Sequence, residues 1–402
     1  MGAIAPALGV IASALGVALL VAGCAGPIFA NVPAAHPSPP ATVAPPSPAH
    51  DPRPIVFPRA DGPHDRLTEW WYDTGHLRDA AGHRYGFEFV IFRAERGDFP
   101  VSWASNLAIT DESGGRFFYQ QRSEVGPQVD RSPRGPDGQP TGFALRLTGA
   151  DPSNPATAAN PATAANPAWS MTGGGGNDRL SAELSSAEAT AARSPGGLGL
   201  DLALATTKPP ALHGGNGWID FGPAGGSYYY SRTRMTATGS LDIGGRRIAV
   251  TGETWFDHQW GDFISVGAGG WDWFAVELAD GTDLTLSLVR DRSGGHPLAY
   301  GTIVGPDGRT THLDRTAFTV TTTRTWTSPG TGATYPAGWR ISVPGERLAV
   351  DLVPTVADQE LDTRATTGVV YWEGSQHISA IRDGRPLGGE AYVELTGYAG
   401  TH

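Results

Sequence analysis

Short runs in which hydrophobic and polar residues alternate recur along this chain from about residue 66 onward. Residues 85–91 and residues 271–278 show the pattern, and turns rich in Gly, Asp and Pro separate one run from the next. A period of two is typical of strands that bury one face. The pattern therefore predicts an all-β protein, although residues 180–193 could form either a short helix or another strand and turn.

Two stretches of this pattern resemble each other, which suggests a duplicated domain. Residues 70–93 and residues 271–290 each begin with closely spaced tryptophans, cross a turn that contains Asp and Gly, and end in an alternating strand closed by Arg. Two related β-barrels would account for the pattern and the length, although any two hairpins can look alike by chance. We place the barrels at residues 57–235 and 236–402, with a low-complexity surface loop predicted at residues 151–177.

Alternation also divides the aromatic segment 254–262 into two faces. One face carries Thr254, Phe256, His258 and Trp260. The other carries Trp255, Asp257 and Gln259. In the run that follows, Asp272 shares a face with Phe274. If the more apolar faces line one cavity, His258, Trp260 and Asp272 converge there. His258 then needs a partner from another strand, and Asp272 is the nearest candidate in sequence.

An acid or an imidazole among tryptophans is costly to charge, and a perturbed pKa is what acid–base chemistry requires. Asp272 could stay protonated and donate a proton, His258 could position and deprotonate water, and the rings of Trp71 and Trp260 could stabilise a cation. The alternatives are a structural carboxylate, a hydrogen-bonded core histidine and ordinary aromatic packing.

The N-terminal segment predicts export and lipidation. An apolar run over residues 8–22 has the length of a signal-peptide core, and it ends in Leu-Val-Ala-Gly-Cys24, which resembles a bacterial lipobox. We expect residues 1–23 to be a signal peptide and residues 24–56 to be a Pro- and Ala-rich tether that follows a lipidated Cys24. The protein would then sit on the outer side of the cytoplasmic membrane or in the periplasm.

Composition excludes several kinds of site. A formal net charge of -11 argues against a nucleic-acid surface, and Lys208 is the single lysine, which argues against amine-based covalent catalysis. The histidines show no His-x-His or His-Glu-x-x-His spacing, so the sequence predicts no metal. No Gly-x-Ser-x-Gly or phosphate-loop motif is present, and we expect no cofactor.

Five motifs, in order, resemble those of the lipocalin-like family that contains the carotenoid 1,2-hydratases (hydroxyneurosporene synthases) and the AttH proteins. They are Glu69-Trp70-Trp71-Tyr72, residues 229–235, residues 255–261, residues 371–374 and residues 392–398. The resemblance implies two lipocalin-like antiparallel β-barrels side by side, with an apolar cavity. It also implies either a cofactor-independent hydratase of isoprenoid double bonds or a protein associated with an ABC transporter.

The resemblance carries His258 and Trp260 over as candidate catalytic residues and makes Asp272 the candidate acid. We expect the substrate to be bound by Trp260, Trp71, Trp70, Tyr72, Phe274 and Glu69. The expected partner is a carotenoid, another isoprenoid or a lipid, which the protein would hydrate. The alternative is a non-enzymatic carrier or accessory lipoprotein that exchanges such a molecule with ABC-transporter components, at a membrane that it reaches through Cys24.

Overall fold

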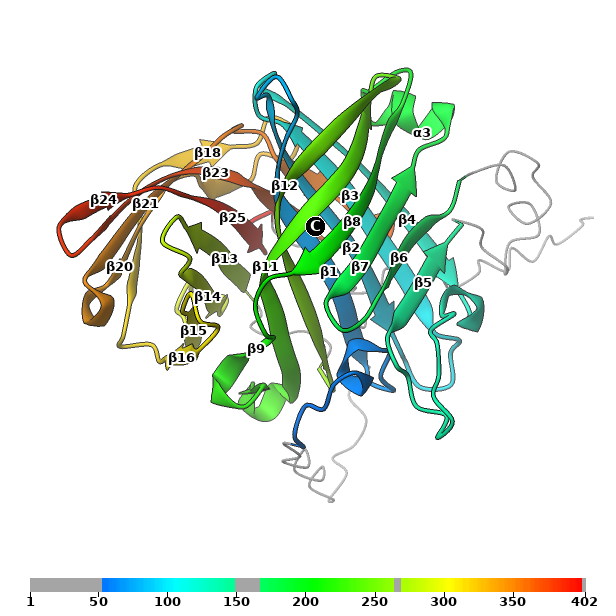
Figure 1. Cartoon of the computed structure of the whole chain (residues 1–402), viewed down its shortest axis with the longest axis horizontal. Coiled ribbons are helices and arrows are strands. Elements are labelled where there is room, and N and C mark those ends of the chain that lie inside the picture. The colour runs from blue at the N-terminus through cyan, green and yellow to red at the C-terminus, as the bar shows by residue number, and fades with distance from the viewer. Residues whose placement is uncertain (1–52, 149–166, 264–268, 400–402) are drawn as a thin grey trace, which may run out of the picture.

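The computed structural model describes residues 53–148, 167–263 and 269–399 (Figure 1). The predicted signal peptide, Cys24 and the tether up to residue 52 lie outside the described residues, as do residues 151–166 of the predicted loop. Almost every element is a strand, and two large antiparallel sheets account for nearly all of them. The predicted all-β class and the two lipocalin-like sheets are confirmed, as one nearly closed barrel and one half-barrel.

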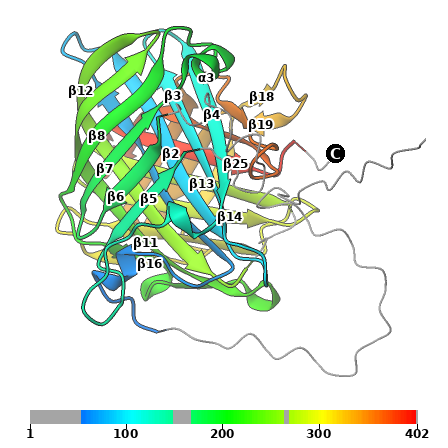
Figure 2. The ribbon, with the colours of Figure 1, turned by 90° about the vertical axis from the view of Figure 1, so that its right-hand side faces the viewer.

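The first sheet has the order β4-β3-β2-β1-β12-β11-β8-β7-β6-β5, with β9 and β10 paired to β11. Its strands are β1 (Thr68–Arg78), β2 (Arg84–Ala94), β3 (Ser102–Asp111), β4 (Arg116–Val125), β5 (Phe143–Leu147), β6 (Trp169–Gly173), β7 (Asn177–Glu183), β8 (Leu198–Thr206), β9 (Ala211–Leu212), β10 (Trp218–Asp220), β11 (Gly226–Ile243) and β12 (Arg246–Gly261). Seen from the side, these strands wrap around a common interior (Figure 2).

The second sheet has the order β16-β15-β14-β13-β25-β23-β21-β20-β17, with β22 and β24 paired to β23. Its strands are β13 (Gly270–Leu278), β14 (Asp283–Arg290), β15 (Leu298–Val304), β16 (Thr310–Leu313), β17 (Thr319–Thr322), β20 (Trp339–Val343), β21 (Leu348–Pro354), β22 (Glu360–Asp362), β23 (Val370–Arg382), β24 (Arg385–Leu387) and β25 (Gly389–Thr396). A separate small hairpin joins β18 (Thr325–Thr327) to β19 (Thr334–Pro336).

Helical segments are few and short. The α-helix α3 (Ser186–Ala191) begins at Ser185, which forms a capping box with Glu188. Five 3₁₀ turns complete the described elements: η1 (Arg59–Asp61), η2 (Pro127–Val129), η3 (His213–Gly215), η4 (Gly222–Ala224) and η5 (Pro344–Glu346). Residues 180–193 thus contain both the end of β7 and a helix. In the described part of the chain, no helix is long and apolar enough to cross a membrane.

The two similar hairpin patterns occupy equivalent positions in the two sheets. β1 pairs with β2 and with β12, and β13 pairs with β14 and with β25. The turns that close the hairpins contain Gly82 and Gly281, whose φ angles of 85° and 83° favour glycine. From β1 and from β13 the chain then forms the same four-stranded meander, β1 to β4 and β13 to β16.

Two details differ from the sequence prediction. β6 lies within the predicted loop 151–177, because Trp169 and Met171 alternate into the interior of the first sheet. The predicted boundary at 235/236 lies within β11, whose 18 residues pair with β12 and β8 on both sides of that position. The change of sheet occurs between Gly261 and Gly270.

The sheets meet along a buried seam that combines rings and charges. Tyr72, Val90 and Trp255 of the first sheet pack against Trp273, Ala275 and Tyr392 of the second. Lys208 bonds the Asp283 carboxylate at 2.6 Å, and His76 Nδ1 lies 2.9 Å from a Glu390 oxygen. Both pairs join the two sheets. Lys208 follows β8 and His76 lies in β1, whereas their partners lie in β14 and β25 of the second sheet.

Candidate active site

Adjacent strands β1 and β12 supply the candidate site, and their register places its residues opposite one another. Trp71 pairs with His258 and Glu69 pairs with Trp260. Trp71, Phe256 and Trp260 belong to the core of the first sheet. Trp255 belongs to the seam instead. The face assignment made from alternation is therefore confirmed for β12.

Glu69 anchors two imidazoles. Its Oε1 lies 2.8 Å from His64 Nδ1 and 2.9 Å from His258 Nε2. Its Oε2 accepts a hydrogen bond from the His64 backbone N–H at 3.0 Å. Burial acts to raise the pKa of this carboxyl, but the charge of His64 and the hydrogen bonds from both histidines outweigh it and lower the pKa to about 2. Glu69 is therefore a buried carboxylate at neutral pH.

The state of Glu69 fixes the tautomer of His258. A carboxylate only accepts hydrogen bonds, so Nε2 of His258 must carry the hydrogen that bonds Glu69. Burial lowers the pKa of His258 below its ordinary value, against the opposing effect of Glu69, so the ring is neutral at pH 7. Its Nδ1 then holds a lone pair, and this atom is buried without a hydrogen-bond partner among the described residues. The arrangement is that of an oriented general base.

Aromatic rings surround this base. The His258 ring lies 4.7 Å from the Trp71 ring and 4.7 Å from the Trp260 ring, measured between centroids. His64 stacks on Trp260 at 4.0 Å with the planes 2° apart. Tyr230 adds an edge contact to His258. The rings of Trp71, Trp260 and Tyr230 are buried, and the ring of His64 is partly exposed. The wall is electron-rich and could stabilise a cation.

A buried ionic cluster that the sequence analysis did not identify contacts the rings around the base. Asp61 accepts hydrogen bonds from Tyr230 Oη at 2.6 Å and from Arg232 at 2.5 Å. Trp71 Nε1 donates to the Asp61 backbone oxygen at 3.1 Å. Asp61 follows a predicted tether and sits in a single 3₁₀ turn, so no local pattern marks it.

The structure does not bring Asp272 to His258, which corrects the expected convergence. Asp272 and Phe274 lie on the inner face of the second sheet, where Phe274 belongs to that sheet's core. The Asp272 carboxylate bonds Arg290 at 3.1 Å and Tyr398 Oη at 3.0 Å. Burial raises its pKa, while Arg290 and Tyr398 oppose the rise. Alternation fixes the face of a strand but not the sheet to which that face belongs. The partner of His258 is Glu69, and a chemical role for Asp272 stays a prediction.

Trp70 and Tyr72 lie on the opposite face of β1 from Trp71, so they do not line the same interior. Tyr72 lies in the seam and donates to the buried Glu373 carboxyl. Trp70 contacts Phe92 and Phe263. Burial, with the charges of Glu88 and Glu394, holds the pKa of Glu373 well above its ordinary value. The six expected substrate contacts thus divide among three environments, with Glu69, Trp71 and Trp260 together.

One set of side chains has donors suited to a metal ion, although the sequence predicts none. Ligand atoms of His64, Glu69 and His258 lie within 4.8 Å of one another. Two imidazoles and one carboxylate are a common donor set for zinc. The two imidazole–carboxylate hydrogen bonds, each with its own proton, explain the same close approach of these side chains without a metal ion.

The comparisons with known proteins place the chain by sequence and by fold. A family model described as AttH-like matches residues 48–398. No curated protein matches the sequence. The crystal structure of an AttH protein from Nitrosomonas europaea is 28% identical with a TM-score of 0.69, covering 89% of this chain and 100% of that one.

Two more distant structures share the fold alone. Kievitone hydratase from Nectria haematococca is 18% identical with a TM-score of 0.61, covering 87% of this chain and 95% of that one. CghA is 16% identical with a TM-score of 0.53, covering 94% of this chain and 98% of that one.

Proposed function

This chain belongs to the AttH-like family, and we propose that it adds water to a carbon–carbon double bond of a long apolar molecule, an isoprenoid or a lipid. The observation that carries the proposal is the orientation of His258. Glu69 holds Nε2–H at 2.9 Å, and the free Nδ1 lies among the rings of the first barrel. The name of one structural neighbour, a hydratase, agrees with this chemistry.

Hydration of an isolated alkene requires an acid, an electron-rich wall and one controlled water. The acid protonates one carbon, and a carbocation forms on the other. Water then attacks the cation while a base removes its proton, so that H and OH are added across the double bond. Trp71 and Trp260 are placed to stabilise the cation through their ring faces, and His258 Nδ1 is placed to accept the proton of the water.

The buried environment supports the roles of Glu69 and His258. The exclusion of water strengthens the contact between Glu69 and the imidazolium that forms when His258 takes a proton. A Glu–His pair with the base on the far ring nitrogen is also the arrangement that orients histidine in other acid–base sites. In this structure the rings pack against one another, so a substrate must displace them to reach Nδ1.

A carrier function is the second candidate, and the Cys24 motif favours it. A lipid anchor would hold the protein at the outer side of the cytoplasmic membrane or in the periplasm, where passing an apolar molecule to an ABC transporter is as useful as changing it. The carrier would bind the molecule in the same barrel without turnover.

The test incubates the purified protein with acyclic carotenoids, neurosporene and lycopene, and follows the products by chromatography and mass spectrometry. Wild type is expected to yield a product heavier by one water. His258→Gln keeps a polar side chain but lacks the base, and its turnover is expected to fall by about 10²–10⁴-fold. His377→Gln, an exposed position on β23, is the matched control. Binding without any product in wild type would support the carrier instead.

A further inference from the structure

Asp73 is a buried acid on the same face of β1 as Trp71. Its side chain is fully buried, and neither carboxyl oxygen has a hydrogen-bond partner among the described residues. In the register, Asp73 lies opposite Phe256 on one side and Phe89 on the other, and both rings belong to the core of the first barrel. A carboxyl without donors in an apolar interior is costly to ionise and is retained only at a cost in stability.

After Glu69, which bonds His258 directly, Asp73 is the next inward carboxyl of β1 in the strand register. His258 lies opposite Trp71, two residues before Asp73 on the same strand. Such diagonal neighbours on one face of an antiparallel pair are about 7–8 Å apart. Packed rings surround both groups in this structure, so an alkene and a water must displace some of them to lie between Asp73 and His258. Two adjacent strands thus carry, on one inward face, the acid and the base that adding H to one carbon and OH to the next requires.

The surroundings of Asp73 favour its protonated form. Burial makes the largest contribution and raises the pKa well above its ordinary value. Asp178 and Asp257 raise it further, while Arg232 opposes them. Arg232 is itself bound to Asp61, which limits the support it can give to a second carboxylate. The protonated form of Asp73 is therefore favoured far more than that of an exposed aspartic acid.

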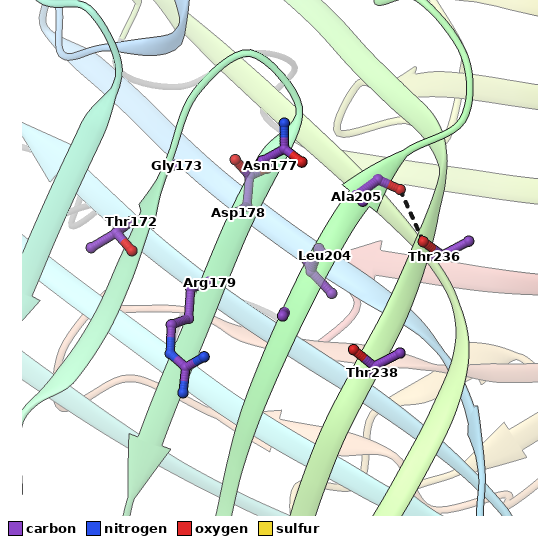
Figure 3. Close-up of a pocket in the computed structure, with 10 residues that line it drawn as sticks. Thr172, Gly173, Asn177, Asp178, Arg179, Leu204, Ala205, Thr236 and Thr238 are labelled. Atoms are coloured by element: carbon purple, nitrogen blue, oxygen red, sulfur yellow. Dashed lines mark hydrogen bonds between the residues drawn. The ribbon is translucent and has the colours of Figure 1, made fainter.

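Asp178 lies close enough to Asp73 for its charge to raise the pKa of Asp73, and it also borders the surface. Asp178 faces inward from β7, and one of its oxygens is buried without a partner among the described residues. The same residue borders a hollow of about 400 Å³ that β6, β7, β8 and β11 line on the barrel wall (Figure 3). Burial raises the pKa of Asp178 to about 7, so this carboxyl exchanges protons near neutral pH.

We propose that Asp73 is the proton donor of the hydration reaction and that Asp178 restores its proton from the hollow. The inference rests on the proposed function. Asp73 transfers its proton to the alkene carbon and becomes a carboxylate. Water forms the new C–O bond, and its proton passes to His258 Nδ1. Asp178 then protonates Asp73 and takes a proton from solvent, and His258 releases one, so the cycle closes with one water consumed.

The experiment compares wild type with Asp73→Asn, Asp178→Asn and Asp272→Asn, and with Asp307→Asn, an exposed loop position, as control. The activity assay is the carotenoid hydration described above. A second readout, independent of activity, is the infrared C=O stretch of protonated carboxyl groups at pH 7. We expect Asp73→Asn to lose one such band and at least about 100-fold in kcat, with little change in KM. Asp178→Asn should still hydrate the carotenoids. As the pH is raised, however, its activity should begin to fall at a lower pH than that of wild type.

The outcomes separate the two proposals. If wild type is active and Asp73→Asn keeps its kcat within about twofold, the donor role is wrong while the function stands, and loss of activity in Asp272→Asn would place the acid there. If wild type hydrates neither carotenoid, the proposed function and the donor role both fall. If the C=O region of a folded Asp73→Asn variant has lost no intensity relative to wild type, Asp73 is ionised in wild type and the donor role alone is overturned.

Discussion

Replacing Glu69 by glutamine tests the buried carboxylate on which the candidate site depends. Glu69 has a pKa of about 2 in place of 4.5. The difference of 2.5 units corresponds to about 3.4 kcal/mol of folding stability at pH 7, at about 1.36 kcal/mol per unit. Because the folded-state pKa is the lower one, this stability is present above pH 4.5 and is lost as the pH falls through about 2. At pH 3 about 1.5 kcal/mol should remain.

The assay is urea denaturation at pH 7 and at pH 3, followed by tryptophan fluorescence, for wild type, Glu69→Gln and the exposed control Glu183→Gln. We expect Glu69→Gln to be less stable than wild type by about 3.4 kcal/mol at pH 7 and by about half as much at pH 3. A difference below about 1 kcal/mol at pH 7, or one that stays constant between the two pH values, would refute the view that Glu69 is a buried anion held by two imidazoles.

Three further predictions concern the seam and the histidine pair. The pKa of His76 is raised to about 10 because Glu112 and Glu390 outweigh the cost of burial. The His76→Gln variant should therefore be less stable than wild type below pH 6.5, and its stability should approach that of wild type as the pH rises through about 10. Thermal melting across that pH range measures the difference. Lys208→Met should lose about 3 kcal/mol in urea denaturation, since it leaves the buried Asp283 one cation short; a loss under 0.5 kcal/mol would contradict the seam assignment. Dialysis against EDTA should leave Tm unchanged, because protons account for the contacts of Glu69 with His64 and His258; a rise in Tm of several degrees on adding Zn²⁺ would identify a metal site instead.

The sequence predicts the faces of the strands well and their partners poorly. Alternation places His258 and Trp260 on one face and Asp257 on the other because side chains of a strand alternate with a fixed period. The contact between Glu69 and His258 joins residues 189 positions apart. It depends on β1 and β12 being neighbours, and nothing in either local pattern specifies that pairing. Asp272 was joined to His258 through nearness in sequence, whereas the two residues lie in different sheets.

Asp73 illustrates the other limit of sequence reasoning. It directly follows the motif Glu69-Trp70-Trp71-Tyr72, and its inward direction follows from alternation. Its lack of hydrogen-bond donors depends on side chains from β2, β7 and β12, which no single stretch of sequence reveals. The ordered strand β6 was missed for a related reason, since the composition of its flank obscures two buried residues.

The ion pairs of the seam tie the stability of each sheet to the presence of the other. A polypeptide divided at 235/236 would cut β11 and leave the edges of β8 and β12 unpaired, which invites aggregation. A division after Gly261 would keep every strand whole, yet it would strip Lys208 of Asp283 and His76 of Glu390. Each half would then carry uncompensated charges on a surface made of tryptophan and tyrosine. We therefore expect that neither half will fold stably when it is expressed alone.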